Sequence, residues 1–158
     1  MNLTGKHIVI LGAGRSGRAA AALALREGAS VAVYDEAESI TGFAPEVSLH
    51  PLATTDIGVQ VKSDLLVVSP GIDTYGPLVA AFSQQADKVV GEMEFAWGYY
   101  DGYTVAITGT NGKTTTTEVI ARIFNASDVS CVPCGNYGKP LAEVVMEHPM
   151  PEVIATFE

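Results

Sequence analysis

The sequence predicts an α/β protein made of two consecutive units, each built on a parallel sheet. Apolar runs of strand length alternate with helical segments along the chain, which is typical of β-α-β units. Two of these runs lead directly into a glycine-rich turn, at residues 12–17 and 109–115. With 47% hydrophobic and 17% charged residues among 158, the composition is that of a globular chain that can bury a core.

The first unit opens with an unbroken apolar run, His7–Leu11, of the kind that is buried on both faces of a parallel sheet. Residues 36–61 have mixed polarity and weak periodicity, so loops, short strands and one helix are expected there. The other elements follow from apolar runs, helical spacing and glycine or proline at their ends: a helix from Ser16 to Glu27, a strand at Ser30–Tyr34, strands at 64–69 and 88–90, and a helix from Pro77 to Gln85 between these two.

The second unit repeats the alternation after a short acidic and aromatic helix at 92–100. We place the division after residue 93, which gives domains 1–93 and 94–158. Three strands and two helices make an undersized domain with an exposed sheet edge, so we expect a fragment of a longer protein. The elements predicted here are a strand at Tyr103–Thr108, a helix at Lys113–Asn125, a strand at Val129–Val132, a helix at Pro140–Glu147 and a strand at Val153–Phe157.

The first glycine-rich turn, Gly12-Ala13-Gly14-Arg15-Ser16-Gly17, has the spacing G-x-G-x-x-G between a strand and a helix. In that context Gly12 permits the tight turn, Gly14 the close approach of a phosphate and Gly17 the close packing of helix on strand. Asp35 ends the next strand, where a carboxylate suits a ribose or a base. A Rossmann-like nucleotide site is therefore predicted, and the residues alone allow NAD. The alternative is that these glycines only shape the turn.

The second turn, Gly109-Thr110-Asn111-Gly112-Lys113-Thr114-Thr115, predicts a P-loop-type ATP-binding domain. Its backbone N–H groups would surround phosphate oxygens, and Lys113 would contact the β- and γ-phosphates. Thr114 would coordinate Mg²⁺, and Thr115 would contact the α- or β-phosphate. The spacing G-x-x-G-K-T is shorter than the usual P-loop, whose first glycine would stand at Ile107.

The net charge of −9 argues against broad binding to nucleic acid or to an anionic membrane. The chain has neither a long apolar run nor a signal-peptide pattern, so we expect a cytoplasmic monomer without nucleic-acid or membrane partners. Cys131 and Cys134 form C-V-P-C, which allows a redox pair or half of a zinc site. Because no second cysteine pair completes a metal set, two reduced and packed thiols are favoured.

Five motifs together resemble the Mur ligases of peptidoglycan synthesis. They are the two glycine-rich turns, Ser69-Pro70-Gly71, Gly91-Glu92-Met93-Glu94 and Gly135-Asn136-Tyr137-Gly138. Folylpolyglutamate synthases share the short G-T-N-G-K-T loop, but they begin with the ATP domain. Within the Mur ligases, the chain is most similar to the members that add D-glutamate to UDP-N-acetylmuramoyl-L-alanine.

The resemblance implies a ligase that uses ATP and Mg²⁺ to phosphorylate a substrate carboxylate, so that the amine of D-glutamate attacks an acyl phosphate. It implies catalytic roles for Lys113 and Glu158 and a metal role for Thr114 and Glu158. ATP would be bound by residues 109–115. The implied substrate contacts are Gly14, Arg15, Ser16 and Gly17 at the diphosphate, Asp35 near the uracil, and Ser69, Gly71 and Asn136 elsewhere.

The chain departs from the family at Asp35-Glu36-Ala37, where the family often has Asp-Thr-Arg. A guanidinium contact to the uracil is therefore missing or supplied from elsewhere. The family's second metal ligands and amino-acid contacts come from later residues, so we expect these 158 residues alone to be inactive. Two other classes of function stay open, a NAD-dependent oxidoreductase and a non-catalytic nucleotide-binding module.

Overall fold

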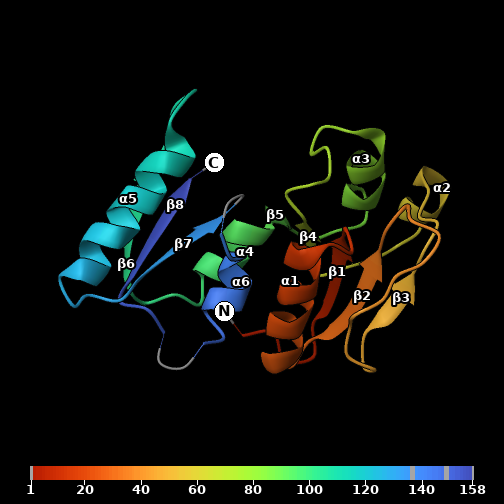
Figure 1. Cartoon of the computed structure of the whole chain (residues 1–158). Helices are drawn as coiled ribbons and strands as arrows, with labels where there is room; N and C mark the ends of the chain where they lie inside the picture. Colours follow the sequence, from red (N-terminus) through yellow and green to blue (C-terminus); the bar gives the residue numbers. More distant parts are fainter. Residues whose placement is uncertain (1, 136–137, 148–149, 158) are drawn as a thin grey trace.

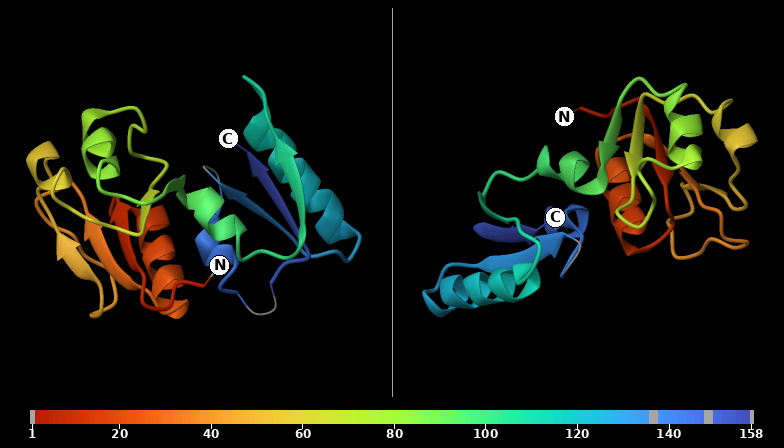
Figure 2. Two further views of the ribbon diagram at one scale, coloured as in Figure 1. Left: turned by 180° about the vertical axis from the view of Figure 1, so that it is seen from behind. Right: turned by 90° about the horizontal axis from the view of Figure 1, so that it is seen from above.

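The computed structural model describes residues 2–135, 138–147 and 150–157. It contains a five-stranded and a three-stranded parallel sheet, with helices α4 (Glu92–Trp97) and α6 (Leu141–Val144) between them (Figure 1). The two further views show the same arrangement from behind and from above (Figure 2). The predicted α/β fold with parallel sheets is confirmed.

The first sheet has the strand order β3-β2-β1-β4-β5. Its central strand β1 pairs with β2 on one side and with β4 on the other, in parallel. Helix α1 (Arg15–Arg26) covers one face of this sheet, and α3 (Pro77–Ser83) lies on the other with the short α2 (Thr55–Gly58). The strands are β1 (His7–Leu11), β2 (Ser30–Tyr34), β3 (Ser48–His50), β4 (Leu65–Val68) and β5 (Val89–Gly91).

Burial on both faces explains why β1 is apolar throughout. Ile8 and Ile10 belong to the core cluster that contains the alanines of α1, whereas Val9 and Leu11 belong to the cluster that contains Phe82 of α3. All four of these β1 side chains are fully buried. Successive strand residues point to opposite faces, so a strand between two helical layers needs apolar side chains at every position.

The second sheet has the order β6-β8-β7, with β6 at Tyr103–Ile107, β7 at Cys131–Gly135 and β8 at Val153–Phe157. Helix α5 (Lys113–Ala126) packs on one face, where its Ala121 joins Val153 of β8. Ile154 points to the other face, and it shares a cluster with the buried residues of α6. Helix α6 therefore lies under the second sheet and also against the first unit.

Cys131 and Cys134 lie on β7 with their side chains in different clusters. Cys131 packs with Ala121 under α5, and Cys134 packs in the cluster that contains α6. Both are buried, reduced thiols. This arrangement agrees with the interpretation as two packed thiols, because residues three apart on a strand point to opposite faces.

The predicted strand at Val129–Val132 is wrong in its position, because β7 begins at Cys131 and ends at Gly135. The end of α5 uses the intervening residues in a turn: Asp128 has φ 60°, and the Val129 N–H donates to the Phe124 carbonyl. The Asn125 side chain then bonds both the N–H and the carbonyl of Cys131. The apolar pattern from which the strand was predicted gives no indication of this side-chain cap.

Several predicted helices are longer than the observed ones. The helix predicted at 92–100 ends at Trp97, since the N–H groups of the next residues bond to carbonyls three positions back. The helix predicted at Pro140–Glu147 is limited to Leu141–Val144, and the one that begins at Pro77 ends at Ser83. Within the described residues, no helix has the length and apolar character needed to cross a membrane.

Candidate functional site

The first glycine-rich turn is shaped by two close approaches. A Cβ on Gly17 would lie 1.9 Å from the Gly12 carbonyl oxygen, so only glycine fits where α1 packs on the turn. Gly12 has φ +99°, and its carbonyl accepts a hydrogen bond of 3.3 Å from the buried Ser69 hydroxyl. The predicted substrate residue Ser69 thus braces the turn from the end of β4.

Gly14 lies on the open side of the same turn. It is the N-cap of α1 without a side-chain hydrogen bond, and a Cβ placed on it would meet no atom within 4 Å. The first N–H groups of a helix have no partner within the helix, and the helix dipole makes this end positive. The turn therefore leaves room and hydrogen-bond donors for an anion.

Asp35 ties the turn to the end of β2. Its Oδ2 accepts a hydrogen bond of 2.6 Å from the Ala13 N–H, and its Oδ1 accepts one of 2.9 Å from the Ala37 N–H. Each carboxylate oxygen can still accept a second hydrogen bond. The carboxylate holds the loop in place, and a contact with a ribose or base would add to that role.

A cavity of about 500 Å³ lies where the two units meet. It adjoins the carboxyl ends of β1 and β4, the point where the strand order of the first sheet reverses and where open α/β sheets bind ligands. The structure thus brings together Arg15, Ser16 and Gly71 of the predicted substrate residues. The lining residues come from α1, from the loop after β4, from the end of β7 and from the segment after it: Arg15, Ser16, Pro70, Gly71, Gly135, Gly138 and Pro140.

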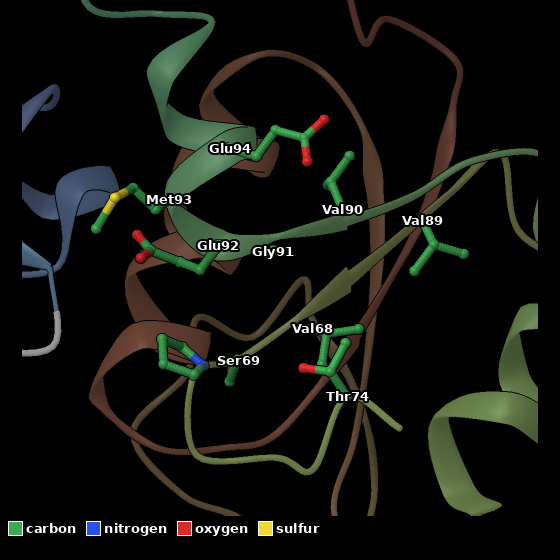
Figure 3. Close-up of a pocket in the computed structure, with 10 residues that line it drawn as sticks. Val68, Ser69, Thr74, Val89, Val90, Gly91, Glu92, Met93 and Glu94 are labelled. Carbon is green, nitrogen blue, oxygen red and sulfur yellow. The ribbon is translucent and has the colours of Figure 1, made fainter. Parts of the chain in front are cut away.

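A second cavity of about 500 Å³ shares Pro70 with the first and includes Ser69 and the start of α4. Figure 3 shows Glu92 and Glu94 leaving α4 on opposite sides, with Glu92 directed toward the segment that contains α6. Glu92 is 2% exposed, and its carboxylate accepts a hydrogen bond of 2.8 Å from the Ala142 N–H. Burial raises the pKa of Glu92 above its ordinary value, and this hydrogen bond partly offsets the increase.

Arg15 crosses from α1 to the second unit. Its Nε and Nη2 donate to the two carboxylate oxygens of Glu143 at 3.1 and 3.0 Å, and Nη1 donates to the Gly138 carbonyl at 3.1 Å. Hydrogen bonding to Glu143 and its charge raise the pKa of the guanidinium further. The residue that the sequence places at the diphosphate is therefore held by the opposite wall of the cavity.

The second glycine-rich loop connects β6 to α5. Gly109 and Gly112 have φ of +144° and +78°, values that a side chain would disfavour. The Lys113 ammonium donates to the Gly109 carbonyl at 2.6 Å, while Thr114 and Thr115 are exposed in the first turn of α5. A Cβ on Gly112 would meet no atom within 4 Å. The residues fit a polyphosphate with a magnesium ion, because an ammonium, a free hydroxyl and an unobstructed backbone lie in one short loop.

Both candidate regions lie at one edge of the second sheet. Strands β6, β8 and β7 are parallel, so the loop after β6 and the segment after β7 leave the sheet at the same edge. One strand separates them, which corresponds to about 10 Å at the usual spacing of strands. The predicted ATP loop and the wall of the first cavity are therefore neighbours.

Two predicted site residues, Asn136 and Glu158, lie outside the described residues. Two contacts of the site were not predicted from the sequence: that of Glu143 with Arg15, 128 positions away, and that of Glu92, in the motif at residues 91–94, with the Ala142 N–H. Neither contact has a local signal, since a glutamate in a helical segment is usually a solvated residue.

Two family models match the chain. Residues 6–91 match the model described as Mur ligase MurD-like, N-terminal domain, and residues 107–153 match the Mur ligase middle domain. A UDP-N-acetylmuramoylalanine–D-glutamate ligase of Synechococcus is 40% identical over 148 residues, which cover 87% of this chain and 30% of the relative. The enzyme of the same name from Pelotomaculum thermopropionicum is 37% identical and covers 97% of this chain and 35% of the relative.

The chain thus spans about a third of the length of the curated relatives it matches. Among solved structures, the UDP-N-acetylmuramate:L-alanyl-gamma-D-glutamyl-meso-diaminopimelate ligase from Neisseria meningitides aligns with a TM-score of 0.53 at 15% identity. The alignment covers 98% of this chain and 52% of that chain, and it supports the fold. On the matches of residues 6–91 and 107–153, the chain belongs to the Mur ligase family, with an N-terminal domain of the MurD-like type.

Proposed function

We propose that this chain carries the nucleotide-binding part of an ATP-dependent ligase that joins D-glutamate to UDP-N-acetylmuramoyl-L-alanine. The single observation that supports it best is the shared sheet edge, where the loop after β6 adjoins a cavity lined by both units. A reaction between a nucleotide-linked substrate and ATP requires two nucleotide sites within reach of each other. The substrates are inferred from the two similar ligases of Synechococcus and Pelotomaculum thermopropionicum, whose names specify UDP-N-acetylmuramoylalanine and D-glutamate.

In this proposal the first unit binds the UDP moiety. The open start of α1 at Gly14 and the cavity beside Arg15 and Ser16 suit a diphosphate, because they combine backbone donors with a guanidinium. Asp35 would accept from the uracil or ribose with its remaining lone pairs. Gly71 and Ser69 would line the path of the sugar, and Asn136 stays a predicted contact.

The loop at 109–115 would hold ATP. Lys113 would move from the Gly109 carbonyl to the phosphates, and Thr114 would bind Mg²⁺ together with the predicted ligand Glu158. ATP supplies the phosphoryl group that activates the substrate carboxylate for attack by the amine of D-glutamate. The side chain of Lys113 and the backbone N–H groups would offset the repulsion between carboxylate and phosphate.

Calorimetry on the 158-residue chain tests the proposal, with UDP, NAD and ATP with Mg²⁺ as separate ligands. We expect UDP to bind more tightly than NAD, and ATP to bind at a second, independent site. Tighter binding of NAD would contradict the proposal and support a nicotinamide-dependent oxidoreductase, which family membership disfavours. Ligase activity itself is tested on the full-length protein, with and without D-glutamate.

A further inference from the structure

Helix α6 belongs to the second unit in sequence but is held by the first unit. Among the described residues, polar contacts join the two units from Arg15 to Glu143 and to the Gly138 carbonyl, from the Arg26 guanidinium to the Val145 carbonyl at 3.1 Å, and from the Ala142 N–H to Glu92. These contacts come from both ends of α1 and from α4. They fix the segment that leads from the Gly138 side of the cavity into α6.

Apolar packing fixes the same helix. Leu141 and Val144 are fully buried, in one cluster with Leu23 of α1 and Phe95 of α4. A close-packed core allows little sliding of one element past another. Glu143, on the turn between Leu141 and Val144, therefore has a defined position relative to the start of α1.

The Arg15 guanidinium has five N–H donors in a planar fork. Glu143 takes two of them and the Gly138 carbonyl takes one, which leaves two with no partner recorded among the described residues. The side chain is 55% exposed and lines the cavity beside Ser16. A two-bond contact with a carboxylate fixes the plane of the guanidinium, and so fixes the direction of its remaining donors.

We propose that Glu143 is a positioning residue for binding of the nucleoside diphosphate: it orients Arg15 so that the two remaining donors face the diphosphate in the cavity. The inference rests on the proposed UDP site. A free arginine side chain loses considerable rotamer entropy when it binds an anion, and the contact with Glu143 removes that loss in advance. The Glu143 carboxylate also reduces the positive charge that the diphosphate meets. Glu143 therefore favours binding only through the orientation that it gives to Arg15.

The charge of Glu143 and its orienting effect on Arg15 change UDP binding in opposite directions. The two effects can therefore be distinguished by experiment. If Glu143 acted only as a competing anion, its neutralisation in Glu143→Gln would strengthen binding of UDP. If it only stabilised the contact between the units, the substitution would weaken binding of UDP and of uridine alike. Positioning predicts weaker binding of UDP and unchanged binding of uridine, which lacks the diphosphate.

The experiment measures UDP affinity by calorimetry and uridine affinity by NMR titration, on the 158-residue chain. The variants are Arg15→Ala, Glu143→Gln and the double variant. The control is Glu118→Gln, which neutralises the partner of Arg122 in another Arg–Glu pair, on α5. Thermal unfolding of each variant confirms that it is folded.

We expect about tenfold weaker UDP binding for Arg15→Ala and about fivefold for Glu143→Gln, with the double variant no weaker than Arg15→Ala. Uridine binding and the Glu118→Gln control should match the unsubstituted chain. Unweakened UDP binding by Glu143→Gln, an equal loss for uridine, or additive losses in the double variant would each overturn the positioning role while leaving the UDP site intact. Failure of the unsubstituted chain to bind UDP would contradict both proposals.

Discussion

Glu92 of α4 and Ala142 at the start of α6 are joined by a hydrogen bond of 2.8 Å between side-chain carboxylate and backbone N–H, across 50 positions of sequence. The carboxylate is buried, so its ionised form is disfavoured and its pKa is raised. This contact joins the two units at their boundary, beside the cavity that Glu92 lines. It also makes the stability of that boundary sensitive to pH.

The first prediction concerns Glu92→Gln. A carboxyl group whose pKa is higher in the folded than in the unfolded protein contributes stability below its ordinary pKa and loses it as pH rises through the raised value. Gln keeps an acceptor for the Ala142 N–H and carries no charge. The variant should therefore gain stability relative to the unsubstituted chain as pH rises from 4 and keep a constant advantage above the raised pKa.

Urea unfolding at a series of pH values measures this difference. Glu94→Gln is the control, since Glu94 lies on the same helix, is exposed and pairs only with Lys88 at 3.4 Å among the contacts recorded for it. Its stability should follow that of the unsubstituted chain at every pH. A Glu92→Gln variant that is less stable at neutral pH would show that the ionised carboxylate is favourable at this position.

A second prediction concerns Gly17→Ala. The added Cβ would lie 1.9 Å from the Gly12 carbonyl oxygen, so the start of α1 must move away from the turn. We expect a loss of about 1–3 kcal/mol in the free energy of unfolding, as for other overpacked positions. Gly71→Ala, where a Cβ meets nothing within 4 Å, should change it by less than about 0.5 kcal/mol. Equal stability of the two variants in urea unfolding would be incompatible with this packing.

A third prediction concerns Lys113→Ala. The ammonium contacts only the Gly109 carbonyl among the contacts recorded for it, so the fold should tolerate its removal. Binding of ATP with Mg²⁺ should weaken about tenfold or more, because a charge-assisted contact to phosphate is lost. Arg122→Ala removes a positive charge from the same helix and serves as the control. If calorimetry gave the two variants the same ATP affinity, residues 109–115 would not be the ATP site.

A fourth prediction concerns the two thiols. Cys131 and Cys134 are buried, and burial raises the pKa of Cys131, so little thiolate forms near neutral pH. A thiol reagent should react with the native chain only as fast as it unfolds locally, and should modify two thiols after denaturation. Rapid modification of the native protein, or two thiols that become reactive in the denatured chain only after reduction, would favour the redox interpretation of C-V-P-C.

Sequence patterns over a few residues were sufficient to predict the elements that neighbouring residues determine. The buried strand at His7–Leu11, the turn at 12–17 and the loop at 109–115 were predicted at the positions where they lie, since glycine spacing and apolar runs act over a few residues. The errors occur where a side chain decides the end of an element. The Asn125 side chain bonds both backbone groups of Cys131, and β7 begins at that residue, later than predicted. No periodicity in the sequence encodes that contact.

The sequence by itself determined two glycine-rich loops, their order along the chain and the parallel α/β architecture, because spacing and hydrophobicity act over short range. Only the tertiary structure decided that α6 packs on α1 and α4, that Glu143 holds Arg15, and that residues of both units line one cavity. These relationships join residues far apart in sequence, and they depend on how buried surfaces fit together in the folded protein. The packing of one four-residue helix therefore sets how the two proposed nucleotide sites face each other.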